Sequence, residues 1–465
     1  MGALISRCAL FNGMREKDIS DIVIEGYGME GEGVAHAGDA VLFVPYTAVG
    51  DRVRVVVDRV KGKVAFAHII KMLSPSAERR DPACPAFGKC GGCAMRHLPY
   101  VTQLEIKKKN VISLFGKNAG IELADIPVCC GEAEDGYRNK VALPFGVEEG
   151  RPVLGMYRRG THKVLPLERC PLHGEWVTPL FAAVTDFARE KKLSVYDERR
   201  GKGLLRHIVA RRLPHRGGYR YGVVLVANGD SIPHEKEFAA AVSAAFEGKA
   251  NVYFCRNTMR NNVILTPEIR TLLGEDALVT ELAGGEWEIS PLSFLQVNFP
   301  VAEKIYADVV DRISAGETVV DAYSGTGIMS ALIGRKASRV VGIEVIRAAT
   351  ENAARNAERF GVGDRVTHLC GEVEELLPSV VREIGDYTLV VDPPRAGLDE
   401  SVTETILRCP PKRILYVSCS PATLTRDVAR LSAAYRVDEV KLYDMFPNTP
   451  HCEVVVSMSR AVPKL

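Results

Sequence analysis

The chain has 465 residues, of which 46% are hydrophobic and 25% charged, and its formal net charge is only +2. This length predicts a globular protein of about three domains, and no apolar run approaches the roughly 18 to 20 residues that cross a bilayer. The twelve cysteines are too sparse for a disulfide scaffold and cluster unevenly, which favours a reducing compartment and metal or catalytic roles. We therefore expect a cytoplasmic protein without membrane association.

The first residues contain a short lipidation pattern, Gly2 with Ser6. The pattern is loose, and an unmodified extension is the preferred interpretation. The start of the chain also lacks a charged head followed by an apolar block, so export is not expected.

Residues 14–75 consist of short alternating apolar segments interrupted by Gly or Pro. Five such strands are typical of a small β-barrel, and their pattern predicts an OB-like domain. A polar, proline-rich boundary, "SPSAERRDPACP", follows.

Residues 76–285 mix strand pairs with helices, which predicts a central α+β domain. A helix is expected over 102–115, where its residues can pack on the catalytic domain. Two strands joined by a turn at "HRGG" are expected between residues 204 and 230.

Residues 286–465 alternate strands with helices, which predicts an α/β, Rossmann-like domain with a seven-stranded, mostly parallel sheet. Helical patterns separate the first four strands and follow the fifth. The last strand follows its predecessor without a helix, so it is expected to run antiparallel at the edge. The expected strands are 318–324, 339–345, 365–370, 387–394, 413–420, 436–444 and 452–459.

A glycine loop, Gly325–Gly327, follows Asp321 at the end of the first of these strands. Glu344 ends the next strand, where a carboxylate can accept both hydroxyls of a ribose. The loop is too short for a pyrophosphate fingerprint, which favours an adenosine cofactor without one. The fourth strand ends in "DPPR", in which two prolines hold Asp392 in a fixed direction. Arg395 stands where amino-group methyltransferases carry an aromatic residue, which disfavours exocyclic nitrogen methylation.

Cys419 of "YVSCSP" ends the fifth strand, and adjacent parallel strands bring it to the sheet edge that holds Asp392. Carbon 5 of a pyrimidine becomes nucleophilic when a thiolate adds to carbon 6, and a base must later remove the proton at carbon 5. Glu453, two residues after His451, is the candidate base. The alternative interpretations are a buried filler thiol and a surface carboxylate on an edge strand.

Cys84, Cys90 and Cys93 form a C-x5-C-x2-C run that is typical of a metal site. Cys170, which precedes a proline, can supply a fourth thiolate, although the adjacent Cys129 and Cys130 compete for that position. Zinc and an iron–sulfur cluster both satisfy four thiolates.

The ordered set "FLQVN", "DAYSGTG", "GIE", "DPPRAGL", "YVSCSP" and "DMFPNTPHCE" resembles the S-adenosylmethionine-dependent RNA uracil carbon-5 methyltransferases. The likeness is greatest to the bacterial branch that makes 5-methyluridine in large-subunit ribosomal RNA. "EGYGMEGEGVAHAGDAVLFVP" resembles that branch's TRAM domain, and "CPAFGKCGGC" resembles its iron–sulfur segment.

The resemblance implies roles for individual residues. It assigns the nucleophile to Cys419, the general base to Glu453, and a [4Fe–4S] cluster, in preference to zinc, to Cys84, Cys90, Cys93 and Cys170. It assigns S-adenosylmethionine contacts to Gln296, Tyr323, Glu344 and Asp392. Ser420 and Asn448 depart from the usual Asn and His, which puts target choice or local packing in doubt.

The expected function is therefore methyl transfer to carbon 5 of a uridine in RNA, with no obligate protein partner. Basic runs in 51–63 and 199–212 are candidates for phosphate contacts, and Tyr323 or Phe446 for stacking on a flipped base. The alternatives are a tRNA uridine methyltransferase, an RNA cytosine carbon-5 methyltransferase, and a non-catalytic iron–sulfur RNA-binding protein.

Overall fold

The computed structural model describes residues 14–461 and divides into two compact units. Within that range the first unit holds residues 14–88, 92–110 and 447–450, and the second holds 89–91, 111–446 and 451–461. The lipidation pattern at Gly2 lies outside the described residues. No helix within residues 14–461 has the length and apolar character that a membrane span needs. The division into domains 14–75, 76–285 and 286–465 stays a prediction.

The first unit contains a six-stranded sheet in the order β1-β5-β6-β4-β3-β2. The first expected strand is divided in two, because the amides of Ile24 and Glu25 bond the carbonyls of Asp51 and Val34 instead of continuing one ladder. Alternate residues such as Leu42, Val44 and Val53 form its apolar core. The strands are β1 (Ile19–Val23), β2 (Gly26–Tyr27), β3 (Gly33–Ala37), β4 (Ala40–Val44), β5 (Arg52–Lys61) and β6 (Val64–Ser74).

The expected helix at 102–115 is α1 (Tyr100–Leu114), continued by a π-helical turn, η1 (Phe115–Ala119). Within the second unit, Val111 and Phe115 pack in the same apolar core as Leu424 and Val428. Asn118 Nδ2 donates to Thr425 Oγ1 at 2.9 Å.

A seven-stranded sheet in the order β10-β9-β8-β11-β12-β13-β14 forms the central part of the second unit. The expected hairpin is confirmed: Arg216 and Gly217, with φ of 49° and 72°, form a two-residue turn of the kind that favours right-handed strand twist. Helices α2 (Val177–Glu190) and α3 (Glu235–Ala245) cover one face. The strands are β8 (Lys140–Glu148), β9 (Arg151–Tyr157), β10 (Val164–Pro166), β11 (Leu205–His215), β12 (Gly218–Ala227), β13 (Ala250–Arg256) and β14 (Ile269–Leu273).

The Rossmann-like sheet has eight strands in the order β19-β18-β17-β20-β21-β23-β22-β7. All seven expected strands are present, but β7 (Val128–Cys130) adds an edge strand parallel to β22. The expected position of the last strand was wrong: β23 lies inside the sheet, antiparallel to both β21 and β22. The other strands are β17 (Thr318–Ala322), β18 (Arg339–Glu344), β19 (Val366–Cys370), β20 (Thr388–Val391), β21 (Arg413–Ser418), β22 (Tyr435–Asp444) and β23 (Glu453–Arg460).

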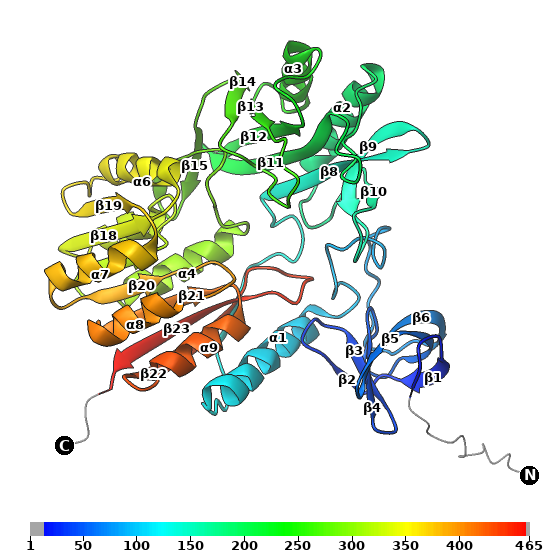
Figure 1. Cartoon of the computed structure of the whole chain (residues 1–465), viewed down its shortest axis with the longest axis horizontal. Coiled ribbons are helices and arrows are strands. Elements are labelled where there is room, and N and C mark those ends of the chain that lie inside the picture. The colour runs from blue at the N-terminus through cyan, green and yellow to red at the C-terminus, as the bar shows by residue number, and fades with distance from the viewer. Residues whose placement is uncertain (1–13, 462–465) are drawn as a thin grey trace, which may run out of the picture. The chain divides into compact units, whose positions relative to one another are not determined.

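Helices cover both faces of this sheet. Figure 1 shows α7 (Val373–Ile384), α8 (Glu400–Arg408) and α9 (Pro421–Leu431) side by side on one face, where their apolar residues share a core. The helix α8 was missing from the sequence prediction, which placed none between the fourth and fifth strands. The opposite face is covered by α4 (Phe299–Asp311), α5 (Ile328–Gly334) and α6 (Arg347–Arg359).

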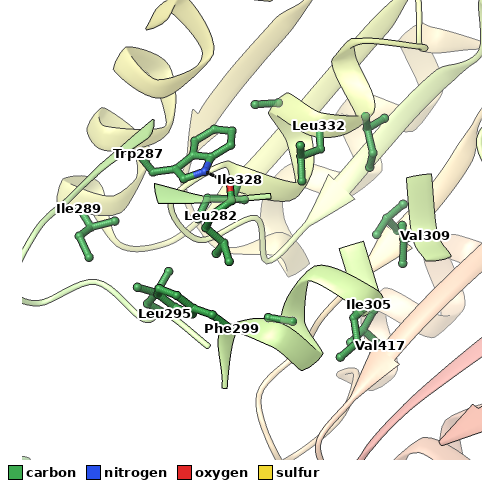
Figure 2. Close-up of a cluster of buried hydrophobic side chains, with 14 of the residues drawn as sticks. Leu282, Trp287, Ile289, Leu295, Phe299, Ile305, Val309, Ile328, Leu332 and Val417 are labelled. Carbon is green, nitrogen blue, oxygen red and sulfur yellow. Dashed lines mark hydrogen bonds between the residues drawn. The ribbon is translucent and has the colours of Figure 1, made fainter. Parts of the chain in front are cut away.

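One continuous core joins the α4 face of this sheet to the central sheet, since Val209 and Leu213 of β11 belong to the same cluster as Val319 and Val417. The hairpin of β15 (Leu278–Leu282) and β16 (Gly285–Ile289) contributes to it. Figure 2 shows the buried Trp287 indole, whose Nε1 donates to the Leu282 carbonyl at 2.7 Å.

Candidate active site

Three of the expected chemical groups meet at one edge of the Rossmann-like sheet. The β21–β23 pairing ends at Ser418 and Val454, so Cys419 and Glu453 follow directly across that ladder. Asp392 follows the last residue of β20, which pairs with β21 on its other side. The carboxyl ends of adjacent parallel strands and the start of an antiparallel strand meet at the same edge. A candidate nucleophile, a carboxylate and a candidate base are therefore neighbours.

Glu453 is an interior carboxyl rather than the surface group of the alternative interpretation. It is only 3% exposed, and its Oε2 has no hydrogen-bond partner. Burial and the nearby Asp392 raise the pKa of Glu453 well above its usual range. Burial, followed by Asp321, raises the pKa of Asp392 to about 7. A carboxyl with a raised pKa in a dry site is suited to proton transfer.

The pKa of Cys419 is affected by the carboxyls of Glu453 and Asp392 and by the guanidinium of Arg395. Burial, Glu453 and Asp392 raise the pKa of its thiol, whereas Arg395 lowers it by charge and by a hydrogen bond. Arg395 likewise opposes the rise in the pKa of Glu453. Sequence reasoning used Arg395 only to disfavour nitrogen methylation. Its position three residues after Asp392 was the signal that could have placed it beside the thiol.

The glycine loop and Glu344 are joined directly. Glu344 Oε2 accepts from the Gly325 amide at 3.0 Å, and its Oε1 accepts from the Ile346 amide at 2.8 Å. Gly327 has a φ of 74°, and a Cβ there would lie 2.6 Å from the Ala353 Cβ, so a side chain is excluded. The partly exposed Glu344 is thus held at the end of β18 with lone pairs still available for a ligand's hydroxyls.

Asp321 and Tyr323 fix the same loop from within. Asp321 is 2% exposed and accepts from Ser330 Oγ at 2.5 Å. Burial, followed by Glu344, raises the pKa of Asp321 to about 7. Tyr323 has a left-handed φ of 66° and donates to Glu374 Oε1 at 3.1 Å. Its partly buried ring therefore has a fixed direction, unlike that of a surface tyrosine.

Gln296 lies in a segment that is tied to two other parts of the second unit. Its carbonyl accepts from Asn139 Nδ2 at 2.9 Å, and the Asn139 amide donates to the Val297 carbonyl, also at 2.9 Å. Asn298 Nδ2 donates to the Met445 carbonyl at 3.3 Å. Gln296 itself is 6% exposed. These bonds hold the "FLQVN" segment in one conformation.

The four expected cluster ligands are all partly buried. Cys84 and Cys93 belong to the first unit, and Cys90 and Cys170 to the second. The Cys84 carbonyl accepts from the Phe87 amide, and the Cys170 carbonyl accepts from the amides of His173 and Gly174, so both cysteines begin tight turns. The competing pair Cys129 and Cys130 lies in β7, where Cys129 packs against the core.

The two departures from the family pattern have local partners. Asn448 has a left-handed φ of 68°, its amide donates to Gln103 Oε1 at 2.8 Å, and its Oδ1 accepts from Arg80 Nη2 at 3.0 Å. All three residues belong to the first unit, so Asn448 contributes to its packing. Ser420 precedes α9, and its amide donates to Ser418 Oγ at 3.1 Å.

Comparison with known proteins identifies two regions. Residues 285–461 match the tRNA (uracil-5-)-methyltransferase family, and residues 18–70 match the TRAM domain. An uncharacterized RNA methyltransferase of Clostridium tetani is 33% identical over 450 residues, covering 96% of this chain and 97% of its own. Another from Bacillus cereus is 35% identical over 462 residues, covering 96% and 98%.

A solved structure is similar over nearly the full length. It is that of Pyrococcus abyssi tRNA (uracil-54, C5)-methyltransferase in complex with S-adenosyl-L-homocysteine. The sequence identity is 26% and the TM-score is 0.74, with 94% of this chain and 100% of the other covered.

Proposed function

Because this chain belongs to the RNA uracil-5-methyltransferase family and is an S-adenosylmethionine-dependent enzyme with a TRAM domain, we propose that it methylates carbon 5 of a uridine through Cys419 and Glu453. The observation that carries this proposal is the meeting of Cys419, Asp392 and Glu453 at one sheet edge. A thiol alone at a strand end would not support it. Covalent catalysis at a pyrimidine needs both a nucleophile and a separate base.

The steps follow from the chemistry of uracil. The Cys419 thiolate forms a bond to carbon 6, and the electrons of the 5,6 double bond move through carbon 5 to oxygen 4. S-adenosylmethionine would supply the methyl group that carbon 5 receives, and its sulfur would keep the electron pair of the broken sulfur–methyl bond and leave as S-adenosylhomocysteine. Glu453 then accepts the proton from carbon 5, the double bond re-forms, and the Cys419 sulfur leaves with the electron pair of its bond to carbon 6. The net release is one proton, which Glu453 returns to solvent.

The charges around Cys419 support these roles. Asp392 and Glu453 both disfavour the thiolate, while Arg395 favours it and also favours ionised Glu453. Arg395 is exposed, so its guanidinium is available to the substrate as well as to the thiol. We assign Arg395 the role of sustaining the two negative charges that the first and last steps require.

Cofactor contacts are proposed for Gln296, Tyr323, Glu344 and Asp392. The Glu344 carboxylate, fixed by the Gly325 and Ile346 amides, supports a ribose at the end of β18. The buried Ser324 Oγ, which has no partner, leaves a further donor at this loop.

An iron–sulfur cluster is proposed on Cys84, Cys90, Cys93 and Cys170, with zinc as the alternative. Four thiols, two of them at the start of backbone turns, suit either group. The methyl transfer moves no net electrons, so we propose a structural or RNA-positioning role. Iron and acid-labile sulfide in protein purified without oxygen would separate the two metals, because a zinc protein contains neither.

Large-subunit ribosomal RNA is the proposed substrate, on the resemblance of the motifs. The Pyrococcus protein is named for tRNA uracil 54, and a tRNA substrate is therefore the second candidate. Exposed Arg52 and Arg59 of β5 support phosphate contacts, whereas Arg54 is paired with Asp21 through Nε and Nη2. In the second basic run, however, Arg206 and Arg211 are buried, with 6% and 3% exposed, so they are not surface phosphate contacts. A cytoplasmic location fits either RNA.

Nucleoside analysis tests the proposal. Labelled S-adenosylmethionine is incubated with the protein and with unmodified ribosomal RNA or tRNA, and each RNA is digested to nucleosides. We expect labelled 5-methyluridine from one of them. Labelled 5-methylcytidine would favour the cytosine alternative, and no labelled nucleoside from either RNA would favour a non-catalytic RNA-binding protein.

A further inference from the structure

Two cations lie side by side on the face of the central sheet that packs toward the catalytic core. Arg211 of β11 is the register partner of Lys140 of β8, and directly paired residues of an antiparallel ladder point to the same face. Val209 and Leu213, two residues to either side of Arg211, belong to the core shared with the Rossmann-like sheet. Arg211 is 3% exposed, whereas Lys140 is half-buried.

Arg211 is buried without a compensating charge. Its Nη2 donates to the Ser293 carbonyl, but its Nε and Nη1 are buried without a partner. Burial lowers the pKa of Arg211 to about 10, so the guanidinium remains charged near neutrality. Burial, followed by Arg211 and Arg138, lowers the pKa of Lys140 to about 8. Within residues 14–461 neither cation forms an ion pair with a carboxylate.

An unpaired buried charge with unmet donors destabilises a protein strongly. A planar guanidinium with two unused N–H groups is suited to a bidentate bond with a carboxylate or a phosphate. The nearby Ser293 Oγ is also buried without a partner. Beyond the Arg211–Ser293 carbonyl bond, the cluster therefore offers two positive charges and several unused donors, and no carboxylate among residues 14–461 pairs with them.

The cluster borders the segment assigned to the cofactor. Arg211 bonds the Ser293 carbonyl, and Asn139, adjacent to Lys140, bonds the Gln296 carbonyl. Leu295 and Phe299 of this segment are packed in the core, as Figure 2 shows, so its backbone cannot readily move away from the cations. A group bound there would lie on the same segment as Gln296.

We propose that Arg211 and Lys140, with Ser293 Oγ, bind one anionic group: a phosphodiester of the RNA or the carboxylate of the cofactor's methionine moiety. This inference rests on the proposed function, because the two sources are its two substrates. The half-buried Arg138, two residues before Lys140, extends the positive charge, which suits a polyanion.

The test compares Arg211→Met and Lys140→Met with the matched control Arg408→Met, whose guanidinium is exposed on α8. The carboxylate arm measures affinity for S-adenosylhomocysteine and for methylthioadenosine, which lacks the amino-acid part. If the site holds the carboxylate, Arg211→Met lowers the affinity for S-adenosylhomocysteine about tenfold, which is the effect of one lost charged hydrogen bond. The affinity for methylthioadenosine should not change.

The phosphodiester arm measures the binding of a labelled oligouridylate over a range of salt concentrations, with S-adenosylhomocysteine saturating. Loss of one phosphate contact reduces the slope of log affinity against log salt by about 0.7 in Arg211→Met. Lys140→Met, at a partly exposed position, should act in the same direction. If Arg211→Met fails to fold, Lys140→Met alone decides between the outcomes.

Variants at Arg211 and Lys140 that match Arg408→Met in both arms would overturn the inference. Neither arm requires turnover. A failure of the anion-site inference is therefore distinct from a failure of the proposed function. The proposed function is tested separately, by the methylated nucleosides that the unaltered protein makes.

Discussion

Cys419 and Glu453 are neighbours across the β21–β23 ladder, one residue beyond the paired Ser418 and Val454. Glu453 is the first residue of β23 and Cys419 directly follows the last residue of β21, so paired strands position both. Because β23 is inserted between β21 and β22, the candidate base comes from the interior of the sheet and is only 3% exposed. This strand order places the buried Glu453 carboxylate next to the Cys419 thiol.

The pH dependence of methyl transfer should follow the charges at this edge. Cys419 and Glu453 must both be ionised to act, and the pKa of each is raised. The single-turnover rate should therefore rise with pH until both groups are ionised. Asp392 raises both pKa values and Arg395 lowers both, so Asp392→Asn should shift the midpoint to lower pH and Arg395→Gln to higher pH. Shifts in the opposite directions would contradict this arrangement of charges.

Asp392 should also make stability depend on pH. Its pKa in the folded protein is about 7, against an ordinary value of 3.8, so its contribution to stability is fully present below about pH 4 and is lost as pH rises through 7. Asparagine cannot ionise. Asp392→Asn should therefore gain on the order of 4 kcal/mol relative to the unaltered protein between pH 4 and pH 8. Thermal unfolding midpoints at both pH values measure this, with the exposed Asp364→Asn as control.

Glu344→Gln should weaken the binding of S-adenosylmethionine without abolishing methyl transfer. The carboxylate accepts from the amides of Gly325 and Ile346 at 3.0 and 2.8 Å, and an amide side chain would point its NH₂ group at one of these donors. Such a mismatch costs about 1 to 3 kcal/mol, so KM for S-adenosylmethionine should rise about tenfold or more with kcat little changed. Glu351→Gln, on the exposed face of α6, is the matched control. An unchanged KM would exclude Glu344 from the cofactor site.

Asn448 is expected to affect stability and not target choice. Asn448→Ala removes the acceptor for Arg80 and Gln103 and places alanine at a φ of 68°, so the free energy of unfolding should fall by about 1 to 3 kcal/mol. Asn448→Asp keeps the acceptor and should retain most of the stability, and Asn262→Ala on an exposed loop should change nothing. A change in the modified nucleoside would instead assign Asn448 to the target.

The sequence predicted the Rossmann-like fold because parallel strands buried on both faces leave long apolar runs, followed by chemical groups at their carboxyl ends. It placed Cys419 and Asp392 at one edge for the same reason. The position of β23 could not be read from local pattern, since an antiparallel strand can lie inside a sheet or at its edge. The three-residue β7 was too short for a periodicity, and its pairing with β22 depends on distant sequence.

The burial and contacts of individual side chains were harder to infer from the sequence than the strands on which they lie. Arg211 stands in a basic run that suggested a solvated surface, but the alternation of β11 directs it toward the apolar core. Asn448 departed from the family pattern without any indication of its partners, because Arg80 and Gln103 lie more than 300 positions away in the chain. Arg395 was recognised as a departure from another enzyme class but not as a neighbour of the thiol.

The most direct test of the central claim is the fate of a Glu453→Gln variant incubated with substrate RNA and S-adenosylmethionine. Without a base, carbon 5 keeps its proton after methylation and the sulfur cannot leave. We expect an RNA–protein adduct that survives denaturation, with peptide mass spectrometry placing the methylated nucleotide on Cys419. A Cys419→Ala, Glu453→Gln double variant should form none, and Glu439→Gln should turn over normally. An adduct on another cysteine, or methylation by Cys419→Ala at an unchanged rate, would contradict the account.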